Sequence, residues 1–244
     1  AREVKDGVIF LAQKLGAPIL PLTNGLTRKL VLKRAWDHFH VPLPFGRSVL
    51  EAERALSPAG PGTVFGTGER LPIGSAAFVN GARVQALEFD DTHNESIVHM
   101  SGPVVAAALA LSQLQPLSGK DVIRAIAIGN EVSCRVGSVA VGQFHKRGFH
   151  PTGLFTPFGV TYLASLLMGL DVDTTSRAVG IVGSFASGLL ECWVDGTDAK
   201  FLHSGWAARA GLTAAALARA GTTGPPAILE GRFGLFASHV QDTS

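Results

Sequence analysis

The run Ala178-Val179-Gly180-Ile181-Val182-Gly183 consists only of apolar and small residues, and it lies within a longer helical pattern over Thr174–Leu190. A helix that is apolar on nearly every side is typical of the centre of a large helical core. Helical periodicity also marks four other stretches, namely Val104–Leu114, Asp121–Val136, Phe158–Leu170 and Gly205–Ala220. Because strand signals are few and short, the sequence predicts an all-α fold, a large domain that resembles a helical bundle.

Glycine and alanine are abundant inside these stretches, and small residues allow neighbouring helix backbones to approach closely. Asp173 is placed to cap the start of one helix, and Gly221 is placed to end another. Ser118-Gly119 predicts a turn, and Ser57–Leu71, which holds a cluster of proline and glycine, predicts an exposed connection.

The composition is that of a globular protein. The chain has 244 residues, of which 46% are apolar and only 16% charged, so it has enough apolar material for a sizeable core. The net charge is +2 and the basic residues are scattered, which argues against a nucleic-acid partner. Apolar stretches such as Pro103–Leu111 are far shorter than the roughly 18 to 20 residues of a spanning helix, so no membrane partner is expected. Residues 1–6 are charged and show no secretory signal, so we expect the cytoplasm or an organelle matrix.

Polar residues stand out in this chain, because burying a polar group without a partner costs roughly 1 to 3 kcal/mol. The first polar cluster is Glu88-Phe89-Asp90-Asp91-Thr92-His93, followed by His99. Two adjacent carboxylates repel each other, so either they point in different directions or one of them is neutral. A solvated acidic turn that caps a helix is the alternative interpretation.

Two further clusters follow along the chain. Gly148-Phe149-His150-Pro151-Thr152-Gly153 places a histidine beside a threonine in a backbone framed by glycine. Asp195-Gly196-Thr197-Asp198-Ala199-Lys200, with His203 after it, opens the last helix, and a helix N-terminus favours an anion bound next to Lys200. The alternatives are a structural role for His150 and a solvated surface position for Lys200.

Metal and redox centres are not predicted. The two cysteines, Cys134 and Cys192, form no CxxC pair and suggest neither a disulfide framework nor a zinc site. An iron–sulfur cluster needs about three or four thiolate ligands, more than the sequence provides. The i, i+4 spacing that places two ligands on one helix face is lacking among His93, His99, His150 and His203, although ligands distant in sequence can meet in a fold. We therefore expect chemistry by side chains, with no metal and no cofactor.

Six blocks of sequence occur in a specific order. They are Phe78-Val79-Asn80-Gly81, Ala86-Leu87-Glu88-Phe89-Asp90-Asp91-Thr92-His93, His99-Met100-Ser101, Gly148-Phe149-His150-Pro151-Thr152-Gly153, Ala199-Lys200-Phe201-Leu202-His203 and Thr223-Gly224-Pro225-Pro226-Ala227-Ile228-Leu229-Glu230-Gly231. In this order the blocks resemble the MmgE/PrpD family, which includes 2-methylcitrate dehydratase and cis-aconitate decarboxylase. The resemblance is strong over residues 70–236 and weak over residues 1–69.

The resemblance implies a large all-α domain, usually dimeric, that holds a substrate against a smaller α+β lid. The sequence stops at Ser244, just past the last block, so we expect this chain to lack the lid. Three positions depart from the family: Glu88 replaces the usual aspartate, Gln85 a common histidine and Met100 a common proline. Carried over motif by motif, the family's site residues are Glu88, Thr92, His99, His150 and Lys200.

These residues suggest a lyase that acts on a small tri- or dicarboxylate by acid–base chemistry. We expect His150 or His99 to move the proton, because an unperturbed imidazole titrates near neutral pH. Lys200 is expected to hold a substrate carboxylate, and Asp91 and Thr92 to orient the site. Further contacts with the substrate are predicted for Glu88, His93, His203 and Thr152.

The sequence leaves the reaction open. Dehydration of a 2-methylcitrate-like acid is favoured by the breadth of the family, and decarboxylation of cis-aconitate and epimerisation are the alternatives. A competing class is a non-catalytic protein, a homologue without a lid that serves as a binding or assembly subunit. We expect a homodimer, although helices rich in small residues form dimer surfaces as well as cores.

Overall fold

The computed structural model describes residues 29–31, 40–42 and 45–240 of the chain. The chain divides into two units, residues 1–44 and 45–244. In the first unit, strand β1 (Lys29–Val31) pairs antiparallel with β2 (His40–Pro42). The charged stretch at residues 1–6 lies outside the described residues.

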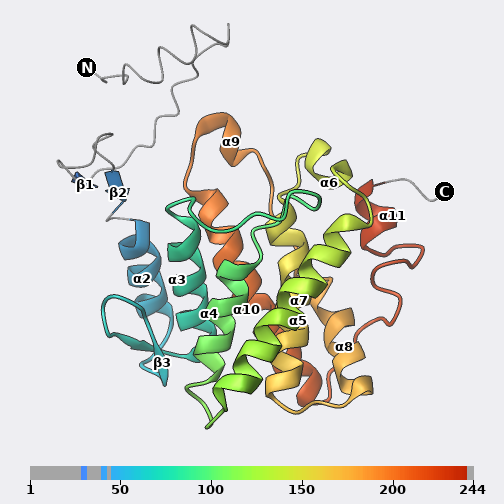
Figure 1. Ribbon diagram of the computed structural model, residues 1–244, viewed down its shortest axis with the longest axis horizontal. Coiled ribbons are helices and arrows are strands. Elements are labelled where there is room, and N and C mark those ends of the chain that lie inside the picture. Colours follow the sequence, from blue (N-terminus) through green and yellow to red (C-terminus); the bar gives the residue numbers. More distant parts are fainter. Residues whose placement is uncertain (1–28, 32–39, 43–44, 241–244) are drawn as a thin grey trace, which may run out of the picture. The chain divides into compact units, whose positions relative to one another are not determined.

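The second unit consists mainly of helices (Figure 1). In chain order its elements are α2 (Phe45–Leu56), β3 (Gly62–Thr63), β4 (Arg70–Leu71), α3 (Ile73–Gln85), α4 (Ser101–Leu111), α5 (Gly119–Ser138), α6 (Gln143–Lys146), α7 (Pro151–Leu167), α8 (Val172–Val182), α9 (Cys192–Asp195), α10 (Ala199–Arg219) and α11 (Leu235–Val240). The strands β3 and β4 form one short antiparallel pair. The predicted all-α fold is therefore confirmed.

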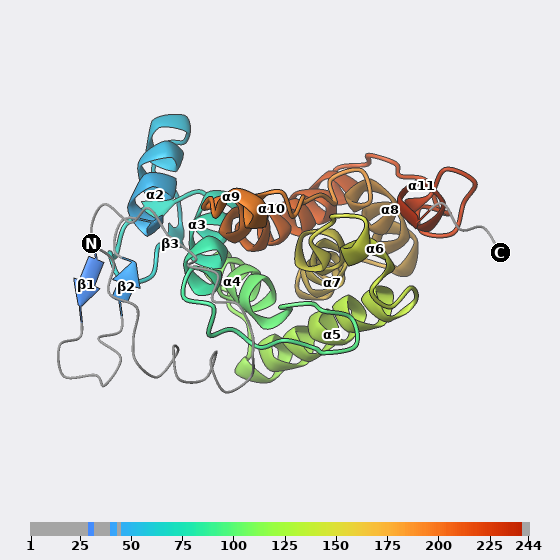
Figure 2. The same ribbon diagram turned by 90° about the horizontal axis from the view of Figure 1, so that it is seen from above.

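Helix α7 is the central helix of this unit, and it packs against α4, α5, α8 and α10 (Figures 1 and 2). Apart from Tyr162 and Leu166, all of its residues are buried. The apolar run 178–183 lies mainly in α8, which packs against α7 and α10. The all-round apolar pattern thus correctly indicates a helical core, but the helix at its centre is α7 rather than α8.

The helices make backbone contact where their side chains are smallest. A Cβ atom on Gly159 of α7 would overlap the carbonyl oxygen of Gly129 and the hydroxyl of Ser133, both in α5. A Cβ atom on Gly205 of α10 would overlap the carbonyl oxygen of Phe78 in α3. The close packing predicted from the small residues is present at both crossings.

Several helices begin earlier than the sequence pattern predicts. Helix α7 begins at Pro151 rather than Phe158, because proline, which lacks an N–H, fits the first position of a helix. Helix α10 begins at Ala199 rather than Gly205, and α4 begins at Ser101. The missed first turns carry polar residues, which interrupt the apolar pattern used for the prediction.

Helix α8 differs from the prediction at both ends. It ends at Val182 rather than Leu190, since the chain after it turns back and donates a backbone hydrogen bond to α7. Its N-cap is Asp171, whose carboxylate accepts a hydrogen bond from the N–H of Thr174 at 2.7 Å. Asp173, the predicted cap, lies in the first turn instead.

Of two other predicted helix ends, one is displaced and one is confirmed. Ser118-Gly119 is not a turn, because α5 already begins at Gly119, and Ser118 is its N-cap, whose hydroxyl accepts a hydrogen bond from the N–H of Asp121 at 3.1 Å. Gly221 follows the end of α10 with a φ of +99°, a conformation that favours glycine.

The predicted exposed connection at Ser57–Leu71 is wrong in part. It contains the β3–β4 pair, and the side chains of Val64 and Leu71 are buried in an apolar cluster with residues of α3. Helices α2 and α3, on either side of it, have no counterpart among the predicted helices. Within the described ranges, the helices all fall short of the length and apolarity needed to cross a membrane.

The contact between α5 and α7 gives a direct test of the packing. Gly159→Ala is expected to lower the free energy of unfolding by roughly 1 to 3 kcal/mol, as overpacking of a core does, because the new methyl group overlaps Gly129 and Ser133. Urea denaturation followed by circular dichroism measures the change.

Gly119→Ala, at the start of α5, is the matched control. Its Cβ position has no neighbouring atom within 4 Å, so the free energy of unfolding should stay the same or rise slightly. Equal stability of the two variants would contradict the close packing of α5 and α7.

Candidate active site

The predicted site residues gather where the loop after α3 meets the first turns of α4, α7 and α10, at the upper end of these helices in Figure 1. The backbone N–H of His99, just before α4, donates a hydrogen bond to the hydroxyl of Thr152 in α7 at 3.0 Å. The rings of His150, at the start of α7, and His203, in α10, share a hydrogen bond of 2.9 Å. The starts of α4, α7 and α10 therefore lie close together, and a helix N-terminus favours negative charge.

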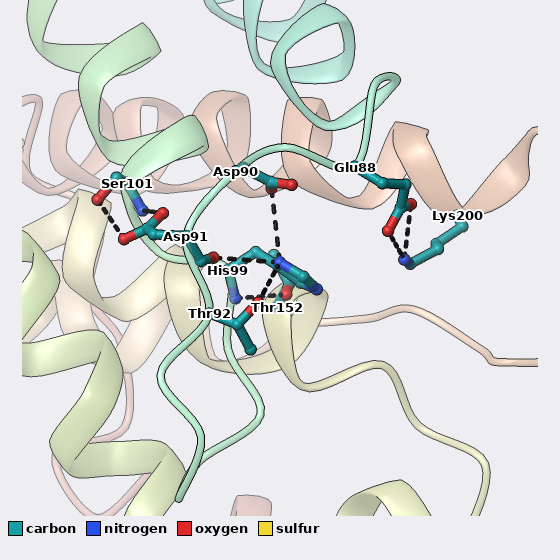
Figure 3. Close-up of polar contacts among 8 residues, drawn as sticks. All are labelled: Glu88, Asp90, Asp91, Thr92, His99, Ser101, Thr152 and Lys200. Atoms are coloured by element: carbon teal, nitrogen blue, oxygen red, sulfur yellow. Dashed lines mark hydrogen bonds and ion pairs between the residues drawn. The ribbon is translucent and has the colours of Figure 1, made fainter. Parts of the chain in front are cut away.

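Lys200 is the cation of this site, and it lies in the first turn of α10 rather than before the helix. Its Nζ donates to both carboxylate oxygens of Glu88, at 2.7 and 2.6 Å (Figure 3). The Lys200 side chain is only 12% exposed, whereas that of Glu88 is 44% exposed. The ring of Trp193, in α9, lies 5.5 Å from Nζ. The site thus already holds one carboxylate against a largely buried ammonium group.

Glu88 reaches Lys200 from an unusual backbone conformation. Its φ is +54°, in the left-handed region that residues with a side chain seldom occupy. Its N–H donates to the carbonyl oxygen of Gln85, the last residue of α3, at 3.0 Å. Such a conformation costs of the order of 1 kcal/mol and is often found at functional sites. The turn after α3 therefore directs the carboxylate toward α10.

His99 is held by the loop that precedes it. Its Nδ1 lies 3.1 Å from the carbonyl oxygen of Asp91 and 3.1 Å from the hydroxyl of Thr92 (Figure 3). A carbonyl oxygen can only accept a hydrogen bond, so Nδ1 carries the hydrogen. The other ring nitrogen, Nε2, is therefore the atom that can gain or lose a proton.

The adjacent carboxylates of Asp90 and Asp91 point in different directions (Figure 3). The Asp91 carboxylate accepts from the N–H of Ser101 at 3.2 Å and from its hydroxyl at 2.6 Å, so it stabilises the start of α4. The Asp90 side chain turns inward, where it is 2% exposed, and its Oδ2 lies 3.7 Å from Nδ1 of His99. Burial raises the pKa of Asp90. Of the two possibilities that the sequence left open, the structure shows that the carboxylates point in different directions.

Asp90 is not among the residues that the sequence analysis selected for the site. The available signal was its place between Glu88 and Asp91 in an acidic run, together with the repulsion expected between neighbouring carboxylates. That signal does not show which of the carboxylate side chains points toward the protein interior. Trp193 is a second member of the site without a sequence signal.

His150 and His203 form a neutral pair. Their two Nδ1 atoms are 2.9 Å apart, so one donates and the other accepts, and the pair cannot keep this bond with both Nδ1 atoms protonated. Burial lowers the pKa of His150 well below its usual value, and the charge of nearby Lys200 adds to this effect. Burial and Lys200 also lower the pKa of His203 to about 4. Both rings therefore stay uncharged near neutral pH.

The structure does not bring His93 to this cluster. Its Nδ1 accepts a hydrogen bond from the hydroxyl of Ser96 at 2.8 Å, within a local turn. The ring lines a separate pocket of about 450 Å³, formed by His93, Glu95, Glu131, Cys134, Arg135, Ser138 and Val139. Across the described part of the chain, no three side chains of histidine, cysteine, aspartate or glutamate lie close enough together to hold a metal ion.

Comparisons with known proteins show which family the chain resembles. Residues 42–244 match the family model described as the MmgE/PrpD N-terminal domain. The cis-aconitate decarboxylase-like protein oryM of Aspergillus oryzae is 32% identical over 80% of this chain. The cis-aconitate decarboxylases of Aspergillus terreus and Homo sapiens are 31% and 36% identical over 80% and 71% of it.

The matched region is only part of each relative. It covers 42% of the Aspergillus oryzae protein, 41% of the Aspergillus terreus protein and 37% of the human protein. The chain therefore spans about two fifths of the length of the curated relatives that it matches.

The neutral histidine pair predicts a specific dependence of stability on pH. Above about pH 6.5, His203 is neutral in both the folded and the unfolded chain, so it adds no pH dependence. Below that value the unfolded chain binds a proton that the folded chain does not, and the free energy of unfolding should fall until about pH 4. Urea denaturation between pH 7 and pH 4 measures this fall.

His203→Asn is the informative variant, because its amide can keep a hydrogen bond to His150 without the titrating ring. It should lose less stability than the wild-type chain over the same pH interval. In NMR, the His203 ring should titrate near pH 4, and a midpoint at or above 6.5 would show that the pair is not kept neutral.

Proposed function

Since the chain belongs to the MmgE/PrpD family, we propose that it binds a small tricarboxylate at the Lys200 site and decarboxylates it by side-chain acid–base chemistry, with cis-aconitate as the preferred substrate. The groups that take part are the side chains of Lys200 and His99. The whole reaction is a proposal, because the chain spans only part of its relatives.

The observation that carries the proposal is the bidentate hydrogen bonding of a carboxylate by Lys200. The Glu88 carboxylate sits on a largely buried ammonium group at a helix N-terminus, where the environment favours negative charge. A substrate carboxylate has the same shape and charge as the Glu88 side chain and can replace it. The exposed position of Glu88 leaves room for this exchange.

His99 is the group that we assign to proton transfer. When the substrate loses carbon dioxide, the electron pair of the broken C–C bond stays on carbon and takes up a proton. His99 can supply that proton from Nε2, because Nδ1 is already committed to the carbonyl oxygen of Asp91. Lys200 holds a carboxylate that remains on the substrate, and its charge stabilises the negative charge that develops beside it.

His150 has a different role in this proposal. Its burial and its hydrogen bond to His203 keep it neutral, so it is a poor source of a proton near neutral pH. A neutral imidazole can instead orient the substrate through a hydrogen bond. Of the two histidines that the sequence offers for proton transfer, the geometry therefore supports His99.

The named relatives favour decarboxylation over dehydration. Those reported above carry the name cis-aconitate decarboxylase or a name derived from it. The dehydratase reaction, preferred from the sequence on the breadth of the family, becomes the second candidate. The homodimer and the contacts of Thr152 and His93 with the substrate stay predictions.

A purified chain incubated with cis-aconitate, citrate or 2-methylcitrate tests the proposal by NMR. We expect carbon dioxide and a five-carbon dicarboxylate from cis-aconitate. Lys200→Met should weaken binding by about 10- to 100-fold, because a hydrogen bond to a charged group contributes roughly 1.5 to 3 kcal/mol. His99→Gln should keep binding and lose roughly 10²- to 10⁴-fold in turnover.

Lys120→Met, which removes an exposed lysine from the start of α5, is the matched control and should bind and turn over as the wild-type chain does. Loss of water from 2-methylcitrate would support the dehydratase instead. Binding without turnover favours the non-catalytic subunit. Equal binding by the wild-type chain and Lys200→Met would remove the basis of the proposal.

A further inference from the structure

Asp90 is a buried carboxyl group that receives no hydrogen bond from another residue among those that the structure describes. Its side chain is 2% exposed, and the one hydrogen bond that it accepts comes from its own backbone N–H. An isolated charge in a protein interior is strongly unfavourable unless an opposite charge compensates it. We therefore expect a positive charge to form next to the Asp90 carboxylate when a neighbouring group takes up a proton.

His99 is placed to supply that charge. Its Nδ1 lies 3.7 Å from Oδ2 of Asp90, too far for a hydrogen bond but close enough for a strong charge interaction (Figure 3). Because Nδ1 already donates to the carbonyl oxygen of Asp91, protonation at Nε2 makes the ring a cation. The positive ring then lies beside the Asp90 carboxylate.

Other charged groups around Asp90 and His99 also change the pKa of Asp90. Burial raises the pKa of Asp90, His99 and the backbone N–H of Asp90 itself lower it, Glu88 raises it and Lys200 lowers it. His99 also faces His150 of α7, with 6.2 Å between the ring centroids. His150 is held neutral, so it adds no competing cation. Asp90 and His99 therefore lie close together with no other imidazolium beside them.

We propose that Asp90 is a positioning residue that acts through His99, as the counter-ion of the imidazolium that forms when His99 carries a proton at Nε2. This inference rests on the proposed function, in which His99 gives that proton to the substrate carbon. In that step the N–H bond at Nε2 breaks, its electron pair stays on nitrogen, and a C–H bond forms. No bond to Asp90 forms or breaks, and its carboxylate only stabilises the charged ring before the transfer.

Asp90→Asn tests the inference, because it keeps the shape of the side chain and removes its charge. The protonated fraction of the His99 ring at a fixed pH, followed by NMR, should fall, because the imidazolium loses its counter-ion. The pH profile of turnover should shift toward lower pH. Asp173→Asn, which removes an exposed carboxylate from the first turn of α8, is the control and should leave both unchanged.

A second measurement on the wild-type chain covers the case in which Asp90→Asn does not fold. The Asp90 carboxyl carbon and the His99 ring should report shared titration steps, as strongly interacting groups do. Independent single-step titrations, or an unchanged protonated fraction of His99 in Asp90→Asn, would overturn the inference. These titrations need no turnover, so an inactive chain that shows them contradicts only the proposed function, whereas an active chain without them contradicts only the role of Asp90.

Discussion

The close backbone contact between α3 and α10, which cross at Gly205, determines the geometry of the candidate site. Gly205 lies against the carbonyl oxygen of Phe78, so α10 and α3 approach as closely as backbones can. Glu88 follows the end of α3, and Lys200 lies in the first turn of α10. The spacing of these two helices therefore sets the distance between the two charges. A larger side chain at position 205 would separate them without touching either one.

The largely buried ammonium group of Lys200 lies near two imidazoles, those of His150 and His203, whose pKa values are lowered so that they stay neutral. His150 and His203 stay neutral because they are buried, share one hydrogen bond and lie near Lys200. In the proposed complex, an anionic ligand meets the ammonium group of Lys200 at the start of α10. Two acidic residues lie beside the basic groups of the site: Glu88 is hydrogen-bonded to Lys200, and Asp90 lies next to His99.

Sequence patterns predicted the helical fold because an apolar core needs apolar residues at helical spacing, and α4, α5, α7, α8 and α10 show them. The starts of α7 and α10 were missed because polar residues, such as Thr152 and Lys200, interrupt that spacing. Most of the residues that gather at the candidate site could be named from their motifs, but the directions of their side chains could not. His93 follows Thr92 directly yet binds Ser96, and Asp90 turns inward while Asp91 accepts a hydrogen bond from Ser101 at the start of α4.

The proposed function requires that a substrate carboxylate can take the place of the Glu88 carboxylate on Lys200. A crystal structure of the chain with tricarballylate, an unreactive tricarboxylate, shows whether this exchange occurs. We expect a ligand carboxylate within hydrogen-bond distance of Nζ of Lys200, with the Glu88 side chain turned away from it. Tricarballylate bound elsewhere, with both Glu88 oxygens still on Lys200, would exclude this exchange.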